Sequence, residues 1–525
     1  MLFTLARGFI LQVTDLHASE TRPGAAERFA KFCKSAFERD FADSKEMDLL
    51  IITGDLVDGT PGIFSAASRG QFKGEWDLVT EAFKPCLEVA ERFKIPIIAI
   101  RGNHDGFGVG PFNSESNVNF LNFRKLIENR KPSKYVEYEG NQIFDIKGTT
   151  VVALDSADTS GQCRQFFGHF NLNVSKWVTQ HIPDNDSDIL FFSHYPIGGY
   201  IKTDRLRLLK VIESYGKRVV GYHAGHFHRG FGYPMLTERG TYTEHQAPHF
   251  LGHSDVRVIG GERWQAVVDA RPLGDDADRM WHSFGSRFDD GRAFVYAPDT
   301  DTFPVGFTGN GGSRRIALGR TTEKTLTASY PPPVKGVWEV EFIDFKPAFL
   351  NRWMFTHVQE ALLVMSFVFQ CSALLFALWL YFRCPKTDLF PVINLISCVI
   401  MPIAPLAIFQ AIPGRYSLVF WWGALTLDDF TLMPNDISTM GVVFVQGKVL
   451  VASACLLLLT RFNNIAIRVT VGILVLVMQL VVQRQMLHRG GLTGMFGFPF
   501  LWDLTFWALS GVIFSFKSFA SDKLE

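Results

Sequence analysis

Five short polar clusters, each directly after an apolar run, constrain the fold of this chain more than any other feature. The apolar runs have the length of buried strands and occupy residues 9–14, 49–52, 95–100, 189–192 and 219–222. The clusters that follow them are Asp15-Leu16-His17, Gly54-Asp55-Leu56-Val57-Asp58, Arg101-Gly102-Asn103-His104-Asp105, Ser193-His194-Tyr195-Pro196 and Gly225-His226-Phe227-His228. Because ligands of open α/β sheets bind at the carboxyl ends of the strands, we expect the five clusters to converge at one edge.

The side chains of these clusters are typical ligands of divalent metals. They offer carboxylate and amide oxygens and imidazole nitrogens, a mixture that suits manganese, iron, zinc or magnesium. They contain no thiolate, which would select a softer metal. Any one cluster taken alone could be an ordinary polar turn, whereas five clusters at the ends of five predicted strands favour a metal site.

The first part of the chain, residues 1–236, is predicted to be a layered α/β domain. Its apolar strand runs alternate with stretches of helical spacing at 23–39, 76–93, 171–182 and 204–215. A further strand over 151–156 ends in Asp155 and Ser156, which we place at the same sheet edge. Residues 106–119 are rich in Gly, Asn, Ser and Pro, so they predict a loop that leaves the site and helps to define the substrate.

The middle part, residues 237–345, predicts a small β-rich module, with an irregular linker as the alternative. Glycines at 309–312, prolines at 331–333 and the alternating stretch 338–342 are typical of short antiparallel strands. The cysteines before residue 346 are Cys33, Cys86 and Cys163, and they have no paired spacing. We therefore expect no disulfide framework and no zinc-thiolate site.

The last part, residues 346–525, predicts about five membrane spans. Segments 361–382 and 389–412 have no charged residue and are long enough to cross a hydrocarbon core of roughly 30 Å. The three further candidates are 440–460, 465–482 and 495–516, and the aromatic segment 420–422 is expected to lie at the interface rather than to form another span. Basic and acidic residues balance at 52 each, so no basic field suggests nucleic acid as a partner.

The ordered set of motifs resembles the calcineurin-like metallophosphoesterase superfamily over roughly residues 9–230. The resemblance implies two divalent metal ions, one held by Asp15, His17, Asp55 and His228 and the other by Asp55, Asn103, His194 and His226. It also implies that His104 protonates or stabilises the leaving oxygen, and we expect Asp105 to fix the tautomer of His104. Asp58 either supports a ligand or caps the following turn.

The order of domains resembles that of the transmembrane protein 62 family, whose members carry an immunoglobulin-like insert. This narrower resemblance implies that the β-rich module is immunoglobulin-like and that the C-terminal region is an α-helical transmembrane bundle. The remaining histidines match no motif position, so we expect them to be ordinary surface or core residues; they include His169, His181, His223, His245, His249 and His253.

Together these features predict a membrane-anchored phosphoesterase that hydrolyses a phosphomonoester or phosphodiester by attack of a metal-bridged hydroxide. A lipid-linked phosphate is one substrate option, because a tethered domain lies near the membrane lipids. The alternative is a catalytically silent multi-span scaffold or receptor with a metal-binding module. The sequence leaves the membrane and the oligomeric state open, and the charges near the span ends do not decide the orientation. The family resemblance implies a non-cytosolic catalytic domain, in which the sequons that begin at Asn173 and Asn185 would be glycosylation acceptors.

Overall fold

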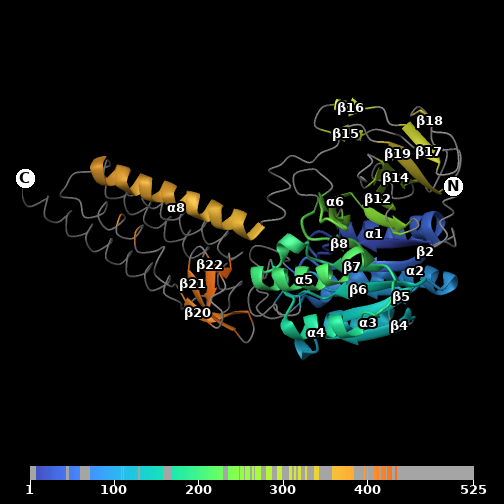
Figure 1. Cartoon of the computed structure of the whole chain (residues 1–525), viewed down its shortest axis with the longest axis horizontal. Helices are drawn as coiled ribbons and strands as arrows, with labels where there is room; N and C mark the ends of the chain where they lie inside the picture. The colour runs from blue at the N-terminus through green and yellow to red at the C-terminus, as the bar shows by residue number, and fades with distance from the viewer. Residues whose placement is uncertain are drawn as a thin grey trace, which may run out of the picture. The chain divides into compact units, whose positions relative to one another are not determined.

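The computed structural model divides the chain into two compact units, residues 1–160 with 165–357 and residues 161–164 with 358–525 (Figure 1). The residues that the structure describes are 8–42, 47–59, 71–107, 109, 112–127, 130–157, 167–228, 235–247, 249–253, 255–260, 263–264, 266–272, 280–285, 292–297, 307–309, 312–314, 317–320, 326–327, 336–341, 358–383, 395, 399, 407–412, 415–420, 423–427 and 432–433.

Two mixed β-sheets form the centre of the first unit. The six-stranded sheet has the order β13-β12-β11-β1-β2-β3, with β1 (Phe9–Val13), β2 (Met47–Ile52), β3 (Ile97–Ala99), β11 (Val256–Gly260), β12 (Ala266–Pro272) and β13 (Met280–Gly285). The seven-stranded sheet has the order β4-β5-β6-β7-β8-β10-β9, with β4 (Ser133–Tyr138), β5 (Asn141–Ile146), β6 (Thr149–Leu154), β7 (Ile189–Ser193), β8 (Val219–Ala224), β9 (Met235–Glu238) and β10 (Thr243–Gln246). Strands β1, β2 and β3 run parallel, as do β6, β7, β8 and β10, so their carboxyl ends gather at one edge of each sheet.

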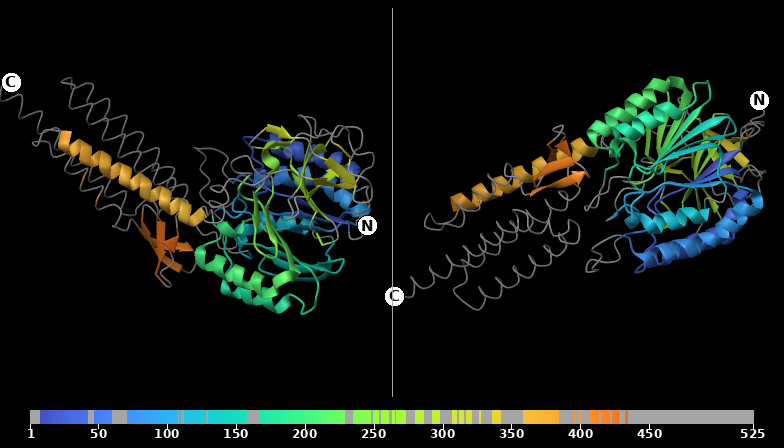
Figure 2. Two further views of the ribbon diagram at one scale, coloured as in Figure 1. Left: turned by 45° about the horizontal axis from the view of Figure 1, so that its top comes forward. Right: turned by 90° about the horizontal axis from the view of Figure 1, so that it is seen from below.

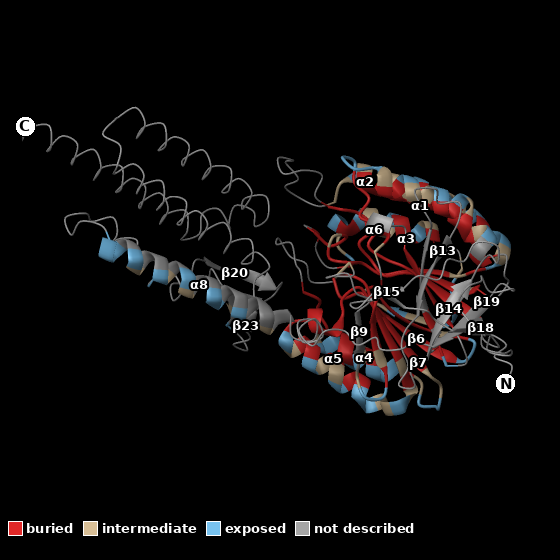
Figure 3. Cartoon of the chain, turned by 90° about the horizontal axis from the view of Figure 1, so that it is seen from above, coloured by how far each residue is buried: buried red, intermediate tan, exposed pale blue. Residues whose placement is uncertain are grey.

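Helices cover the outer face of each sheet (Figure 2). The helices α1 (Gly24–Lys34), α2 (Lys73–Phe93) and α3 (Val118–Ile127) share a hydrophobic core with the six-stranded sheet, and α4 (Leu172–His181) and α5 (Lys202–Tyr215) share one with the seven-stranded sheet. A third core, which includes Ile10, Ile51, Phe144 and Phe192, lies between the sheets, where strands β1, β2, β6, β7 and β8 are almost wholly buried (Figure 3). The predicted α/β layered architecture is therefore confirmed, and the order of its layers is helix, sheet, sheet, helix.

The regular elements of this unit follow the predicted pattern closely. Every strand run that precedes a polar cluster forms a strand, and the predicted helices correspond to α1, α2, α4 and α5. The first helix is shorter than predicted because α1 ends at Lys34 and the chain continues as a π-helix over Phe37–Phe41. The predicted loop after the third cluster contains a short 3-10 helix, Glu115–Asn117, before α3 begins.

A disulfide between Cys33 and Cys86 contradicts the expectation that the cysteines are unpaired. Cys33 lies on α1 and Cys86 on α2, both side chains are fully buried, and the two helices pack side by side. Sequence spacing missed this bond because the cysteines are 53 residues apart and only the packing of the helices brings them together.

The strands after residue 236 do not all form a separate module. Strand β11 pairs with β1, and β12 and β13 extend the same sheet, so the layered domain continues beyond the predicted limit at residue 236. The short helix α6 (Phe250–His253) precedes β11. The later strands form a four-stranded sheet and a hairpin: β14 (Arg292–Ala297), β15 (Phe307–Gly309), β16 (Gly312–Arg314), β17 (Ala317–Arg320), β18 (Leu326–Thr327) and β19 (Gly336–Glu341). The predicted β-rich character is present, whereas an immunoglobulin-like topology stays a prediction.

In the second unit the structure describes one long helix and one small sheet. Helix α8 (Val358–Arg383) contains the predicted span 361–382, and the sheet is built from β20 (Ala407–Ile412), β21 (Arg415–Phe420), β22 (Gly423–Thr426) and β23 (Leu432–Met433). Strand β20 occupies the end of the predicted span 389–412, where Ala407, Ile408 and Phe409 pair with β21 instead of continuing a helix. The predicted spans 440–460, 465–482 and 495–516 lie outside the described residues. Among the described residues, no helix meets the length and hydropathy needed to cross a membrane.

Candidate metal centre

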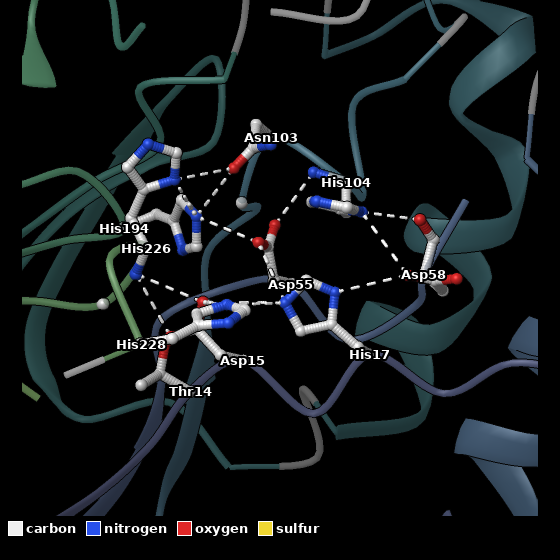
Figure 4. A network of polar contacts seen from close by, with 12 residues as sticks. Thr14, Asp15, His17, Asp55, Asp58, Asn103, His104, His194, His226 and His228 are labelled. Atoms are coloured by element: carbon white, nitrogen blue, oxygen red, sulfur yellow. Dashed lines mark hydrogen bonds and ion pairs between the residues drawn. The ribbon is translucent and has the colours of Figure 1, made fainter. Parts of the chain in front are cut away.

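All five polar clusters converge at the carboxyl ends of β1, β2, β3, β7 and β8, as the sequence predicts (Figure 4). The backbone there is unusual, because Asp15, His17, Asp55, His226 and His228 have φ values of 55°, 48°, 54°, 80° and 51°. Left-handed backbone is uncommon for residues other than glycine, and it concentrates at functional sites. These backbone conformations therefore set the directions in which the five side chains point.

Two glycines allow two of the loops to touch. Gly54 has a φ of +93°, and a Cβ atom there would lie 2.2 Å from the backbone nitrogen of Gly102. A Cβ atom on Gly102 would lie 2.1 Å from Oδ1 of Asp55. Larger residues at either position would separate the loops that carry Asp55 and Asn103.

The first group of candidate ligands consists of Asp15, His17, Asp55 and His228. Nε2 of His228 lies 3.0 Å from Oδ1 of Asp15 and 2.9 Å from Nε2 of His17. Nε2 of His17 lies 3.5 Å from Oδ2 of Asp55. Asp15, His17 and Asp55 are buried and His228 is partly exposed, so the group opens to solvent on the His228 side.

The second group of candidate ligands consists of Asp55, His194 and His226, with Asn103 beside them. Oδ1 of Asn103 lies 3.0 Å from Nε2 of His194 and 2.9 Å from Nδ1 of His226, and Nε2 of His194 lies 3.2 Å from Oδ2 of Asp55. Nδ1 of His194 lies 2.8 Å from the carbonyl oxygen of Thr53. Because a carbonyl only accepts, Nδ1 of His194 carries a proton and its Nε2 is left to face the group.

The chemistry of both groups fits divalent cations. The atoms that face one another are carboxylate oxygens, an amide oxygen and imidazole nitrogens, and each of them can donate an electron pair. Imidazole nitrogens also face each other directly, at 2.9 Å between His17 and His228 and 3.2 Å between His194 and His226. Asp55 belongs to both groups, which is the position that a ligand shared by two ions occupies.

Charges in the site keep the carboxylates of Asp15 and Asp55 ionised and the imidazoles of His17 and His194 protonated. Burial raises the pKa of Asp15, but the charge of His228 and hydrogen bonds from His17 and His228 outweigh it and hold that pKa well below its usual range. Burial lowers the pKa of His17, but hydrogen bonds with Asp15 and Asp58 raise it to about 10. In the same way, Asp55 overcomes the burial of His194 and raises its pKa to about 9. A cation that binds here takes the place of these protons.

His104 lies at the edge of the first group, and its ring contacts that of His17 at 4.4 Å between centroids. Nδ1 of His104 donates to the carbonyl oxygen of Asp58 over 2.6 Å, so Nε2 is the nitrogen available to a substrate. Burial, with Asp55 opposing it, lowers the pKa of His104 to about 4. The carboxylate of Asp58 lies 3.7 Å from Nδ1 of His17 and 2.8 Å from Arg22, so it supports a ligand from behind.

The structure contradicts the predicted role of Asp105. Its Oδ1 accepts hydrogen bonds from the backbone N–H groups of Leu56 and Val57, at 2.9 and 3.2 Å, and its Oδ2 accepts one from Gly102 at 2.9 Å. Asp105 therefore ties the loop after β2 to the loop after β3, while the backbone carbonyl of Asp58 takes the predicted place beside Nδ1 of His104. Burial raises the pKa of Asp105 to about 7.

Among the histidines predicted to be ordinary, one lies beside the site. The ring of His249 stacks on that of His228 with 5.0 Å between centroids, and sequence analysis missed it because residue 249 follows no predicted strand. His223 and His245 stack on each other in the interior, at 5.0 Å and 7°. His169 contacts Asp204, and His181 lies on the exposed end of α4.

Comparisons with known proteins identify the family of this domain. Residues 10–230 match the family model described as calcineurin-like phosphoesterase. A probable cyclic nucleotide phosphodiesterase of Fibrobacter succinogenes is 26% identical over 152 residues, which are 29% of this chain and 43% of the relative. The chain thus spans less than half of the length of that relative. The crystal structure of a dimetal phosphatase from Danio rerio has 12% identity and a TM-score of 0.33, and the alignment covers 49% of this chain and 96% of the phosphatase.

The family match and the converging motifs cover the same part of the chain. The matched range starts in β1 and ends just after His228, so it contains every residue of the two candidate ligand groups. The narrower resemblance to the transmembrane protein 62 family stays a prediction. Residues 10–230 form a domain of the calcineurin-like phosphoesterase family.

Proposed function

We propose that this domain is a dinuclear metal-dependent phosphoesterase that hydrolyses a phosphomonoester or a phosphodiester. The observation that carries the proposal is the position of Asp55, whose carboxylate belongs to both groups of candidate ligands. We assign one ion to Asp15, His17, Asp55 and His228, and the other to Asp55, Asn103, His194 and His226. When bound, two divalent cations lower the pKa of a water nucleophile and neutralise the charge of the phosphate.

The side chains of the protein supply the rest of the chemistry. His104 keeps its Nδ1 proton on the carbonyl oxygen of Asp58, so its Nε2 must take up a proton before it can give one to the leaving oxygen. Burial, which lowers the pKa of His104, makes the protonated imidazole a strong acid. Asp105 holds the backbone of both loops, which keeps Asp55 and Asn103 at a fixed separation.

The ester class is the first question for experiment. A phosphodiester is supported by the name of the Fibrobacter succinogenes relative, and its low coverage leaves a monoester equally open. We would strip metals from the purified full-length chain and assay aryl phosphate monoesters and diesters with manganese, zinc, iron or magnesium. Turnover that returns with metal and is lost in Asp55→Asn, but is kept in a control variant of the exposed Glu88 on α2, Glu88→Gln, is the expected result.

The same experiment separates the enzyme from the competing hypothesis. A catalytically silent scaffold or receptor would bind metal through the same residues and would hydrolyse neither ester class with any of the metals. Metal binding without turnover would therefore favour the scaffold. A lipid-linked phosphate can be tested in the same assay, by presenting the ester in vesicles.

We also propose that the C-terminal region attaches the protein to a membrane and that the phosphoesterase domain faces a non-cytosolic compartment. The uncharged segment 361–382, which lies within α8, supports attachment. The Cys33–Cys86 disulfide supports an oxidising compartment, since such bonds are rare in the cytosol. The asparagines of both sequons, Asn173 and Asn185, are exposed.

A further inference from the structure

A buried ion pair lies directly beneath the loop that carries Asn103 and His104. The guanidinium of Arg101 binds the carboxylate of Asp155 as a fork, with Nε 3.0 Å from Oδ2 and Nη2 3.1 Å from Oδ1. The backbone N–H of Arg101 also donates to Oδ2 of Asp155 over 3.4 Å. Both side chains are fully buried.

The pair joins the two sheets at the edge where the metal ligands lie. Arg101 follows β3 at the edge of the six-stranded sheet, and Asp155 follows β6 in the seven-stranded sheet. Gln142, on the neighbouring strand β5, makes a second link, because its Nε2 donates to the carbonyl oxygen of Ala99 over 3.0 Å. Asp155 is itself held by Asn141, whose Oδ1 accepts from its backbone N–H over 3.1 Å.

The residues packed around the Arg101–Asp155 pair leave its side chains little room to move. The rings of Phe112 and Phe120 lie 5.1 and 6.0 Å from the guanidinium carbon of Arg101. Gly140 has a φ of +82°, and a Cβ atom there would lie 2.7 Å from Oδ2 of Asp155 and 2.6 Å from the ring of Phe112. A planar fork in such an enclosure fixes an orientation, which Lys in place of Arg would not do.

A buried ion pair is weak evidence for a role in stability alone, because an apolar pair of similar size is often as stable. Its position indicates a different role. Arg101 is bonded to Gly102, which contacts Asp55, and the next residue is Asn103, which contacts His194 and His226. Any shift of Arg101 therefore moves a candidate ligand and the proposed proton donor together.

We propose that Arg101 and Asp155 are positioning residues that set the place of Asn103 and His104 in the metal centre. The proposal rests on the proposed function in that it takes Asn103 as a metal ligand. Loss of a partner that orients a ligand typically lowers metal affinity about 10- to 100-fold. The expected effect falls on the ion held by Asn103, His194 and His226 and spares the ion held by Asp15, His17 and His228.

The structure offers a control in a second Arg–carboxylate fork, in which the arginine is buried and the carboxylate is partly exposed. Nη1 and Nη2 of Arg124, on α3, lie 2.6 and 3.1 Å from the carboxylate of Glu137, on β4. This guanidinium lies 5.2 Å from the same Phe112 ring. Neither Arg124 nor Glu137 belongs to a loop that carries a candidate ligand, so Glu137→Gln removes an Arg–carboxylate fork away from the site.

The test compares wild-type full-length protein with Asp155→Asn, Glu137→Gln and the double variant Arg101→Met/Asp155→Leu. The double variant replaces Asp155 by a side chain of the same shape, so it keeps the fold if the single variant fails to fold. Three quantities are measured: the melting temperature, the affinity for Mn²⁺ by titration calorimetry, and hydrogen exchange of the 101–105 amides in metal-free protein. We expect the Asp155 variants to lose about 10- to 100-fold in the affinity of one Mn²⁺ site and to exchange faster at 101–105, while Glu137→Gln changes neither.

A double variant that matches the wild type in Mn²⁺ affinity and in exchange at 101–105 would overturn the proposal, whatever its melting temperature. The outcome is separate from that of the proposed function. If the wild type binds Mn²⁺ but hydrolyses no ester, the proposed phosphoesterase activity is refuted. The Mn²⁺ affinities and exchange rates of the variants still show whether the Arg101–Asp155 pair positions Asn103. If the wild type binds no Mn²⁺, hydrogen exchange at residues 101–105 of the metal-free proteins shows whether the Arg101–Asp155 pair holds this loop in place.

Discussion

Replacing Asp105 tests whether this residue organises two loops or serves His104. In Asp105→Ala, the buried N–H groups of Leu56, Val57 and Gly102 lose their acceptor. Each buried donor without an acceptor costs about 1–3 kcal/mol, so the sum is about 3–9 kcal/mol. That loss is comparable with the whole stability of a domain, about 5–15 kcal/mol, so the alanine variant is expected to unfold or to aggregate.

The milder variant Asp105→Asn gives a measurable shift instead. The amide oxygen still accepts from Leu56 and Val57, whereas the amide nitrogen faces the N–H of Gly102, so one donor loses its acceptor at about 1–3 kcal/mol. For a domain of this size, 2 kcal/mol lowers the melting temperature by about 4–8 °C.

The assay is thermal unfolding of the full-length protein, with and without Mn²⁺, together with turnover of the aryl phosphate on which the wild type acts. His104→Asn is the comparison, since its ring is proposed to act on the substrate. If Asp105 oriented His104, Asp105→Asn would lower turnover as His104→Asn does and would leave the melting temperature within about 1 °C of the wild type. That result would refute the assignment of Asp105 to the loops.

Three further predictions follow from residues away from the metal ligands. Burial raises the pKa of Glu75 from its ordinary 4.5 to about 7, so between these pH values the native state keeps a proton that the unfolded chain releases. The free energy of unfolding should therefore fall by about 3 kcal/mol as pH rises from 4.5 to 7. Glu75→Gln should abolish this fall in melting experiments, and equal pH dependence in both proteins would contradict it. Replacing Cys33 and Cys86 by alanine opens a loop of 53 residues and should cost about 4 kcal/mol in denaturant unfolding; an unchanged midpoint would show that the bond is not formed in solution. A glycosidase should increase the gel mobility of the protein expressed in eukaryotic cells, but not that of an Asn173→Gln/Asn185→Gln variant; protease protection only on the cytosolic side would exclude a non-cytosolic domain.

Local sequence patterns predicted the part of the fold that depends on local physics. A buried strand needs an apolar run, and a surface helix needs an apolar stripe, so β1, β2, β7 and α2 were visible in the residues themselves. The candidate ligands were visible for a related reason, because polar residues directly after a buried strand must emerge at a sheet edge. The distances between these ligands depend on the fold, and the order of the motifs implied that fold through the family resemblance.

Features that depend on which distant segments meet could not be predicted. The Cys33–Cys86 bond needs the packing of α1 on α2, and the place of β11 beside β1 has no local signal. The role of Asp105 was assigned from its neighbour in sequence, whereas its partners Leu56 and Val57 are 49 and 48 residues away. His249, directly before α6, stacks on His228, and no apolar run precedes it in the sequence.

The pairing of β1 with β11 has a consequence for how the chain is made. Ile10 pairs with Ile259, so the first strand must wait for about 250 further residues before its neighbour leaves the ribosome. At about 5–20 residues per second, that interval lasts roughly 12–50 s. During this time β1, all of whose residues are buried in the finished sheet, can pair with β2 but leaves its other edge open. Synthesis of this protein therefore includes an interval in which one edge of β1 has no partner strand from β11.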